Sequence, residues 1–201
     1  LGDSTTAGEN LLHKNRDSRD ELQNIYIKHL NGFRRFVGSG DLGNLGTAHL
    51  HSEELFAGAN NTGSPLVEGQ YQENALNDCH TLRYIGEHCA GLDDIVPCLE
   101  DLQSRQLLGG GGAHGRGMIL IFADAHQGLI IEATSRKLHH QFFQDDAIAV
   151  RTNHFEFPEM QVFCAGAAPG SEIRARRAQE LLEPLSGLMD IATCGEISRD
   201  R

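Results

Sequence analysis

The chain has 201 residues, enough for one domain with a hydrophobic core, and its 39% apolar and 22% charged residues are typical of a globular protein. Its formal net charge of −11 disfavours nucleic-acid binding, which needs a concentrated basic surface. No apolar run approaches the roughly 20 residues that a membrane helix requires. We therefore expect one domain over residues 1–201 that binds neither nucleic acid nor a membrane.

The cysteines are five in number and include no C-x-x-C pair. This pattern is more typical of reduced thiols in a cytosolic protein than of a disulfide framework, so it favours the cytosol while leaving the compartment open. We expect these side chains to act as small buried apolar groups. They are Cys79, Cys89, Cys98, Cys164 and Cys194.

The first third of the chain reads as short strands. The turn-forming composition of residues 3–10, followed by Leu11 and Leu12, predicts a β-hairpin whose first strand lies at or before residue 1. Further β-prone segments are Ile25–Ile27, Phe33–Val37 and, after a glycine-punctuated stretch, a strand that runs into Ala57–Asn61.

Helical periodicity takes over in the middle of the chain. Apolar residues spaced 3, 4 and 3 apart predict a first amphipathic helix from Leu82 to Leu92, with Gly91 at its stop. A second helix carries Ile95, Leu99 and Leu102, with Asp93 and Asp94 in its first turn, where the helix dipole favours anions. The run of glycines at 109–112 is interpreted as a flexible connector.

The last part predicts a second group of strands and a late helix. Met118–Phe122 and Leu129–Ile131 form the two arms of a hairpin. Further strands are predicted at Leu138–Phe143 and Ala147–Arg151, and a helix at Glu172–Leu182 with Ser171 as its N-cap.

This order of elements predicts an α+β fold. Continuous apolar strands imply sheets that are covered on both faces. A four-layer αββα sandwich of two stacked, mainly antiparallel sheets satisfies both observations, although other arrangements would satisfy them too.

Four polar motifs carry a family resemblance. The segment T-x-x-G-x-x-L-x-x-K-N-x-D ends in Lys14, Asn15 and Asp17, and it resembles the second strand of N-terminal-nucleophile (Ntn) hydrolases. The similar members are the acyl-CoA:6-aminopenicillanic acid acyltransferases and the choloylglycine (bile-salt) hydrolases. The resemblance implies that Asp17 lies beside the α-amino group of an N-terminal nucleophile, with Lys14 where arginine is common. Taken alone, the same residues would only finish a strand and start a loop.

The other three motifs follow in the family's order. Thr152-Asn153-His154 resembles the Thr-Asn motif whose amide stabilises the oxyanion, and Ser171-x-x-Arg174 resembles a motif with a site arginine. Gly58–Gly63 resembles a Gly-x-Asn-Glu-x-Gly loop, so Asn60 and Asn61 become candidates for substrate binding, with Asn61 in place of the usual acidic residue. Each motif alone would fit a turn, a cap or a solvated helix face.

The resemblance implies an amidohydrolase or acyltransferase that cleaves the C–N bond of a small N-acyl or amide substrate. It implies a cysteine nucleophile a few residues upstream of Leu1, no cofactor and no metal. We accordingly expect the chain to lack the strand that bears the nucleophile, and to lack C-terminal strands as well. The expected binding partners are the small substrate and other copies of the same chain, which would form a homo-oligomer.

Two alternatives stay open at this point. The eleven histidines could serve a metal-dependent hydrolase, with pairs at His49/His51 and His139/His140, although no H-E-x-x-H motif is present. The chain could also be a catalytically inactive Ntn-fold binding protein.

Overall fold

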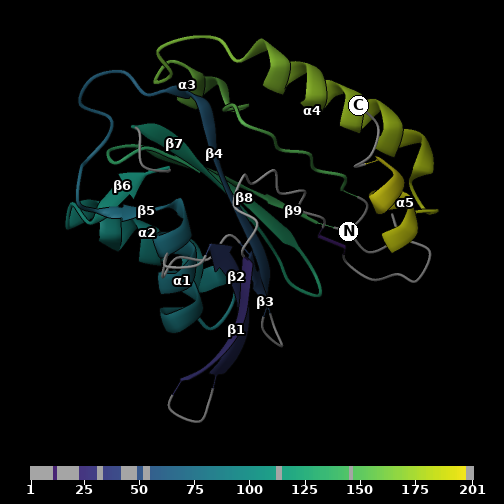
Figure 1. Cartoon of the computed structure of the whole chain (residues 1–201), viewed down its shortest axis with the longest axis horizontal. Coiled ribbons are helices and arrows are strands. Elements are labelled where there is room, and N and C mark those ends of the chain that lie inside the picture. Colours follow the sequence, from purple (N-terminus) through teal and green to yellow (C-terminus); the bar gives the residue numbers. More distant parts are fainter. Residues whose placement is uncertain are drawn as a thin grey trace.

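One large antiparallel sheet organises the molecule (Figure 1). The computed structural model describes residues 11–12, 23–30, 34–41, 49–51, 55–111, 115–144 and 147–197. Within them the sheet has seven strands in the order β1-β2-β3-β4-β7-β8-β9. Their bounds are β1 Gln23–Leu30, β2 Arg34–Asp41, β3 His49–His51, β4 Phe56–Pro65, β7 Arg116–Ala123, β8 Gly128–Ala133 and β9 Leu138–Phe143.

Two layers cover the faces of this sheet. On one side lie the two central helices, and on the other lies the segment that leads into the late helices. A short parallel pair links the two ends of this helical segment: β5 (Leu76–Asn77) precedes the central helices, and β6 (Leu108–Gly110) follows them. The helices are α1 Asp78–His88, η2 Leu92–Asp94, α2 Ile95–Ser104, α3 Pro158–Gln161, α4 Pro169–Leu182, η3 Glu183–Leu185 and α5 Ile191–Ile197.

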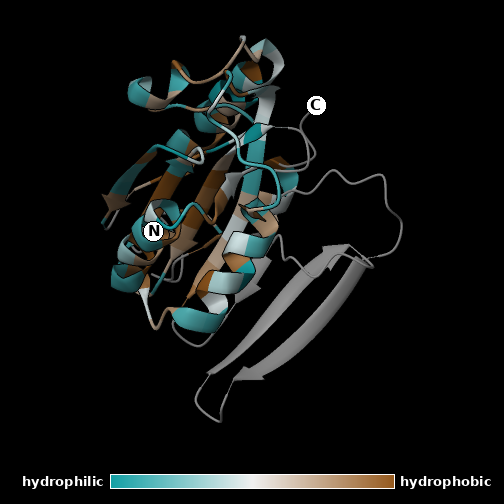
Figure 2. Ribbon diagram, turned by 90° about the vertical axis from the view of Figure 1, so that its left-hand side faces the viewer, coloured by the Kyte–Doolittle hydropathy of each residue, from teal (hydrophilic) through white to brown (hydrophobic). Residues whose placement is uncertain are grey.

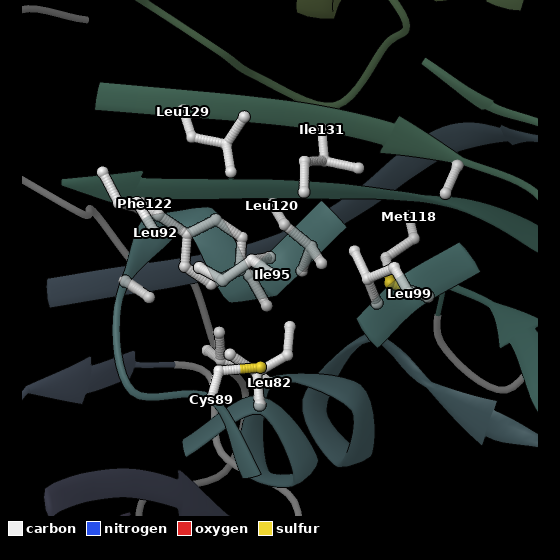
Figure 3. Packing of buried hydrophobic residues seen from close by; sticks show 14 of the residues in the cluster. Leu82, Cys89, Leu92, Ile95, Leu99, Met118, Leu120, Phe122, Leu129 and Ile131 are labelled. Carbon is white, nitrogen blue, oxygen red and sulfur yellow. The ribbon is translucent and has the colours of Figure 1, made fainter. Parts of the chain in front are cut away.

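The strand β7 shows why the apolar runs are continuous. Because successive side chains of a strand point to opposite faces, Met118, Leu120 and Phe122 pack against the central helices (Figure 3), whereas Ile119 belongs to a second cluster on the other face. Each such side chain, when fully buried, contributes about 1.5–3 kcal/mol of transfer free energy. The prediction of an α+β fold with mainly antiparallel strands is confirmed. Of the two stacked sheets in the predicted four-layer sandwich, the described residues form one large sheet, with a two-stranded parallel pair beside it.

The two central helices were predicted correctly in kind, but the first one is placed differently. Helix α1 begins at Asp78 because the Asn77 side chain accepts a hydrogen bond from the His80 N–H at 2.9 Å, which caps the helix. It ends at His88, before the predicted stop at Gly91. In Figure 2 the helices display hydrophilic and hydrophobic bands, as expected where one face lies against a sheet.

The described glycines of the tract, Gly109 to Gly111, are not a flexible connector, so that interpretation was wrong for them. Gly109 and Gly110 belong to the buried strand β6. A Cβ on Gly109 would meet the carbonyl oxygens of Leu76 at 3.0 Å and Gln72 at 3.1 Å, so glycine is required for the close approach of two backbones.

The predicted strand over 147–151 is also absent, because the structure assigns no regular element there. The Val150 carbonyl accepts a hydrogen bond from the Arg151 guanidinium at 2.8 Å, a side-chain donor in place of a neighbouring strand. Among the described residues, no helix combines the length and the apolar character needed to cross a membrane.

Candidate functional site

The polar side chains of the candidate site begin on β4. Asn60 and Asn61 are paired with Ile119 and Met118 of β7, and the register then shifts before Pro65. Such a bulge bends the strand and leaves the residues between Asn61 and Pro65 outside the regular ladder. Both asparagines are half-buried, just before this irregular point.

The Asn153 side chain joins β4 to the late helix. Its Nδ2 donates to Asn60 Oδ1 at 2.8 Å and to the Asn61 carbonyl at 2.9 Å, while its Oδ1 accepts from Arg174 Nη2 at 3.3 Å. The donors and acceptors around this amide fix its orientation, because a flipped amide would place oxygen against oxygen. Residues from β4, from the 152–154 loop and from α4 therefore meet at one amide.

The backbone of Asn153 is held equally firmly. Its N–H donates to Ser171 Oγ at 2.6 Å, and its carbonyl accepts from the Gly63 N–H at 2.6 Å. Every hydrogen-bonding atom of this half-buried residue thus has a partner, which is the condition for burying polar groups without a large penalty. Gly63 suits its place because a Cβ there would lie only 3.3 Å from the Asn153 carbonyl.

Helix α4 begins earlier than predicted, and this changes the role of Ser171. The helix starts at Pro169, a residue that is favoured at a first helical position, after Ala168 as N-cap. Ser171 is therefore not the cap but a residue of the first turn. It is 4% exposed, and its hydroxyl points to the loop that carries Asn153.

A buried ion-pair cluster lies behind this loop. Glu132 on β8 is fully buried and accepts from the backbone N–H groups of Glu156 at 2.8 Å and Phe157 at 3.2 Å. Arg151 Nε lies 3.3 Å from Glu132 Oε1, an ion-pair distance without hydrogen-bond alignment, and Arg151 Nη1 donates to Glu156 Oε2 at 2.9 Å. Burial raises the pKa of Glu132 to about 7, although the two backbone donors and Arg151 oppose that shift.

Phe155 braces the same loop against the sheet. Its ring is 2% exposed and covers Gly117 of β7, where a Cβ would lie within 3 Å of the ring carbons. The Gly117 N–H donates to the buried hydroxyl of Thr62 at 2.8 Å. The absence of a side chain at position 117 therefore lets the loop seat on β4 and β7.

Four of the predicted site residues are brought together, namely Asn60, Asn61, Asn153 and Arg174. Lys14, Asn15 and Asp17 lie outside the described residues.

The sequence reasoning assigned no site role to Ser171 itself or to Glu132. Ser171 was interpreted as a helix cap. Glu132 carried a usable signal, since a carboxylate that directly follows the apolar run Leu129–Ile131 on a covered strand needs a specific partner.

The metal hypothesis finds no support in the described part of the chain. There, no group of three or more His, Cys, Asp or Glu side chains is placed to hold a metal ion. The two histidine pairs lie on β3 and β9, which are separated in the sheet by β4, β7 and β8. At roughly 4.8 Å between neighbouring strands, about 19 Å separates them, so they cannot share one ion.

The fold is that of the Ntn hydrolases. The structure matches that of a Caenorhabditis elegans N-acylethanolamine-hydrolyzing acid amidase (NAAA) ortholog with a TM-score of 0.53, over 92% of this chain and 78% of that chain. The sequence identity is 13%, so this likeness speaks for the fold alone.

The sequence itself gives the family. Residues 66–196, more than half of the chain, match the family model of acyl-coenzyme A:6-aminopenicillanic acid acyl-transferase, and the chain belongs to this family. No curated protein matches the chain. The resemblance drawn from the motifs is confirmed, and family and fold together support an Ntn-type amidohydrolase or acyltransferase in general.

Proposed function

We propose that the chain belongs to an Ntn enzyme that cleaves the amide bond of a small N-acyl substrate. The proposed nucleophile is an N-terminal cysteine upstream of Leu1. The observation that carries the proposal is the meeting of Asn60, Asn153 and Arg174, which come from three separate elements and form one hydrogen-bonded cluster.

The chemistry would follow from the free α-amine of the nucleophile. An α-amino group has an ordinary pKa near 8, so it can accept the proton of its own thiol. The thiolate attacks the amide carbonyl and forms a tetrahedral intermediate. The C–N bond then breaks, and the amine leaves with the proton that the α-ammonium group returns, which gives an acyl-enzyme. Water or an amine then takes the acyl group, which gives hydrolysis or acyl transfer. In this scheme Asp17 orients the α-amine, and Lys14 and Asn15 flank it.

The negative charge on the tetrahedral intermediate needs fixed donors. Asn60 Nδ2 donates one hydrogen to the Thr152 carbonyl at 3.3 Å, and its second hydrogen has no partner within the described residues. Both Nδ2 hydrogens of Asn153 are already engaged. We therefore assign the free donor to Asn60. Asn153 holds that amide in place and can join it by releasing the Asn61 carbonyl.

Arg174 supports this pair from the solvent side. Its exposed guanidinium donates to Asn153 Oδ1 at 3.3 Å, which polarises the amide and strengthens the hydrogen bonds that Nδ2 donates. The remaining N–H groups of the guanidinium form a planar donor set that suits a substrate carboxylate.

The test is amide hydrolysis by the full-length mature protein against a panel of N-acyl amides. Removal of one oxyanion donor typically lowers kcat by about 10²–10³-fold, so we expect that loss for Asn60→Ala. Asn153→Ala should lose a comparable amount, because the Asn60 amide then lacks its support. Both variants should bind substrate with little change in KM.

The matched control is Asn77→Ala, which also removes a side-chain amide that is hydrogen-bonded to the backbone. It deletes the cap of α1 and should cost about 1 kcal/mol of stability without changing kcat. Full activity in folded Asn60→Ala and Asn153→Ala variants would refute the assigned roles. A mature wild-type protein that cleaves none of the amides would favour an inactive binding protein instead.

A further inference from the structure

Ser171 lies at the centre of a compact hydroxyl cluster. Its Oγ is within hydrogen-bond distance of Thr152 Oγ1 at 2.8 Å, Asn153 N at 2.6 Å and His154 Nδ1 at 2.9 Å. One buried hydroxyl thus contacts three consecutive residues, and the middle one is Asn153. No other role of Ser171 accounts for this, since Ala168 is the N-cap of α4.

The protons of this cluster can be placed so that the Ser171 hydroxyl is fully satisfied. The Asn153 N–H and a proton on His154 Nδ1 both donate to Ser171 Oγ, which fills its two acceptor positions. The Ser171 O–H then donates to Thr152 Oγ1, and the Thr152 O–H donates to the Ser171 carbonyl at 2.9 Å. His154 Nε2 lies 3.9 Å from Glu156 Oε1, beyond hydrogen-bond distance, so the cluster ends at His154.

The N-terminal half of α4 therefore contacts Asn153 at both its backbone and its side chain. Ser171 holds its backbone N–H, and Arg174, three residues along the same helix, contacts its side-chain oxygen. Residues three apart on a helix lie on the same face, so both contacts move together with α4. Without the Ser171 hydroxyl, the Asn153 N–H loses its acceptor, and of these two contacts only that of Arg174 still joins α4 to this residue.

We propose that Ser171 is a positioning residue, whose hydroxyl sets the place of the Asn153 amide and, through it, that of the Asn60 amide. The proposal rests on the function proposed above. It predicts that the loss of the hydroxyl affects turnover more than substrate binding, because misplacement of a fixed donor is felt where charge develops.

Ser64 provides the matched control. It is also a buried serine, and its hydroxyl donates to the Ala167 carbonyl at 3.2 Å, so it likewise ties β4 to the segment before α4. Its side-chain hydrogen bond does not reach residues 152–154. Ser171→Ala and Ser64→Ala each remove one oxygen from the same interface, and only the first removes a hydrogen bond to the Asn153 loop.

The experiment compares these variants in the full-length protein, with kcat, KM and the thermal midpoint as readouts. For Ser171→Ala we expect kcat to fall about tenfold and KM to stay within about twofold, as is typical when a supporting hydrogen bond is removed. Ser171→Thr keeps the hydroxyl and should restore kcat to within about threefold of wild type. Ser64→Ala should lower the thermal midpoint with kcat unchanged. An unchanged kcat in Ser171→Ala, or an equal fall in Ser64→Ala, would overturn the proposal.

Hydrogen exchange separates this proposal from the proposed function. In Ser171→Ala the Asn153 amide should exchange about tenfold faster or more, and in Ser64→Ala at the wild-type rate. Equal exchange in the two variants overturns the positioning role even if the wild type is active. If the wild type cleaves no amide, the proposed function fails, and the exchange rates still decide whether Ser171 holds the loop. Should Ser171→Ala not fold, Thr152→Val replaces it in both measurements, with the same expected direction and the same refuting result.

Discussion

Replacing Gly117 by alanine tests whether the Asn153 loop can pack against β7 only because residue 117 has no side chain. An added Cβ would lie 2.8 and 2.9 Å from two carbons of the buried Phe155 ring and closer still to a third. Ordinary contact begins near 3.4 Å, so the ring must retreat by more than about half an ångström or the strand must bend. Overpacking of this kind typically costs about 1–3 kcal/mol, and a fully enclosed ring places this site at about 2–3 kcal/mol.

The assay is equilibrium unfolding by heat or urea, followed by circular dichroism. For a chain of this length, about 2–3 kcal/mol corresponds to a fall of roughly 4–12 °C in the thermal midpoint. Gly166→Ala is the matched control, since a Cβ there meets no heavy atom within 4 Å, and it should change stability by less than about 0.5 kcal/mol.

A double-mutant cycle identifies the cause. Phe155→Leu alone leaves a cavity and should cost about 1–3 kcal/mol, but in the Gly117→Ala background the smaller side chain relieves the clash. The two losses should therefore fall short of additivity by at least about 1 kcal/mol. A Gly117→Ala variant as stable as wild type, or strict additivity with Phe155→Leu, would refute the view that the ring and the glycine fit one another.

Three further predictions concern single side chains. Thr62→Val removes the buried acceptor of the Gly117 N–H and should cost about 1–3 kcal/mol in urea unfolding, and no loss would contradict the hydrogen bond. Since burial raises the pKa of Glu132 from 4.5 to about 7 in the folded state, its stabilising contribution is complete below about pH 4.5 and is lost as the pH rises through 7. Glu132→Gln should reduce the change in unfolding free energy across that window by on the order of 3 kcal/mol, and an unchanged pH dependence would argue against the shift. Arg105→Ala breaks an exposed ion pair with Asp101, and such pairs contribute little, so a measurable fall in the thermal midpoint would be unexpected.

The elements that the sequence predicted well are those with a strong period and a buried face. The hairpin of β7 and β8 and the strand β9 lie where the apolar pattern placed them, and α2 forms where its apolar spacing predicted it. Asp93 and Asp94, expected in the first turn of α2, instead lie in the preceding 3-10 helix η2. The errors have local causes. Asn77 starts α1 early through a side-chain cap, and Gly109 and Gly110 lie in a strand that packs closely against another backbone.

The candidate site was predictable only in part, and for a physical reason. The family motifs gave Asn60, Asn153 and Arg174, whose meeting the structure shows. They could not show that Ser171 and Glu132 hold the loop, because that depends on which residue caps α4 and on which backbone donors face β8. A polar residue at a position where the pattern predicts an apolar one, such as a carboxylate inside an apolar strand, is a candidate for holding a site loop in place.

The bond between Asn60 and Asn153 closes a loop of 93 residues. Closing a loop of that length costs chain entropy, so the contact forms only when the sheet and α4 hold its two ends close together. On the function proposed above, activity depends on this contact. Detachment of the 152–154 loop from β4 would then abolish activity while the sheet and the central helices stay folded, so activity would report local unfolding before any measure of secondary structure does.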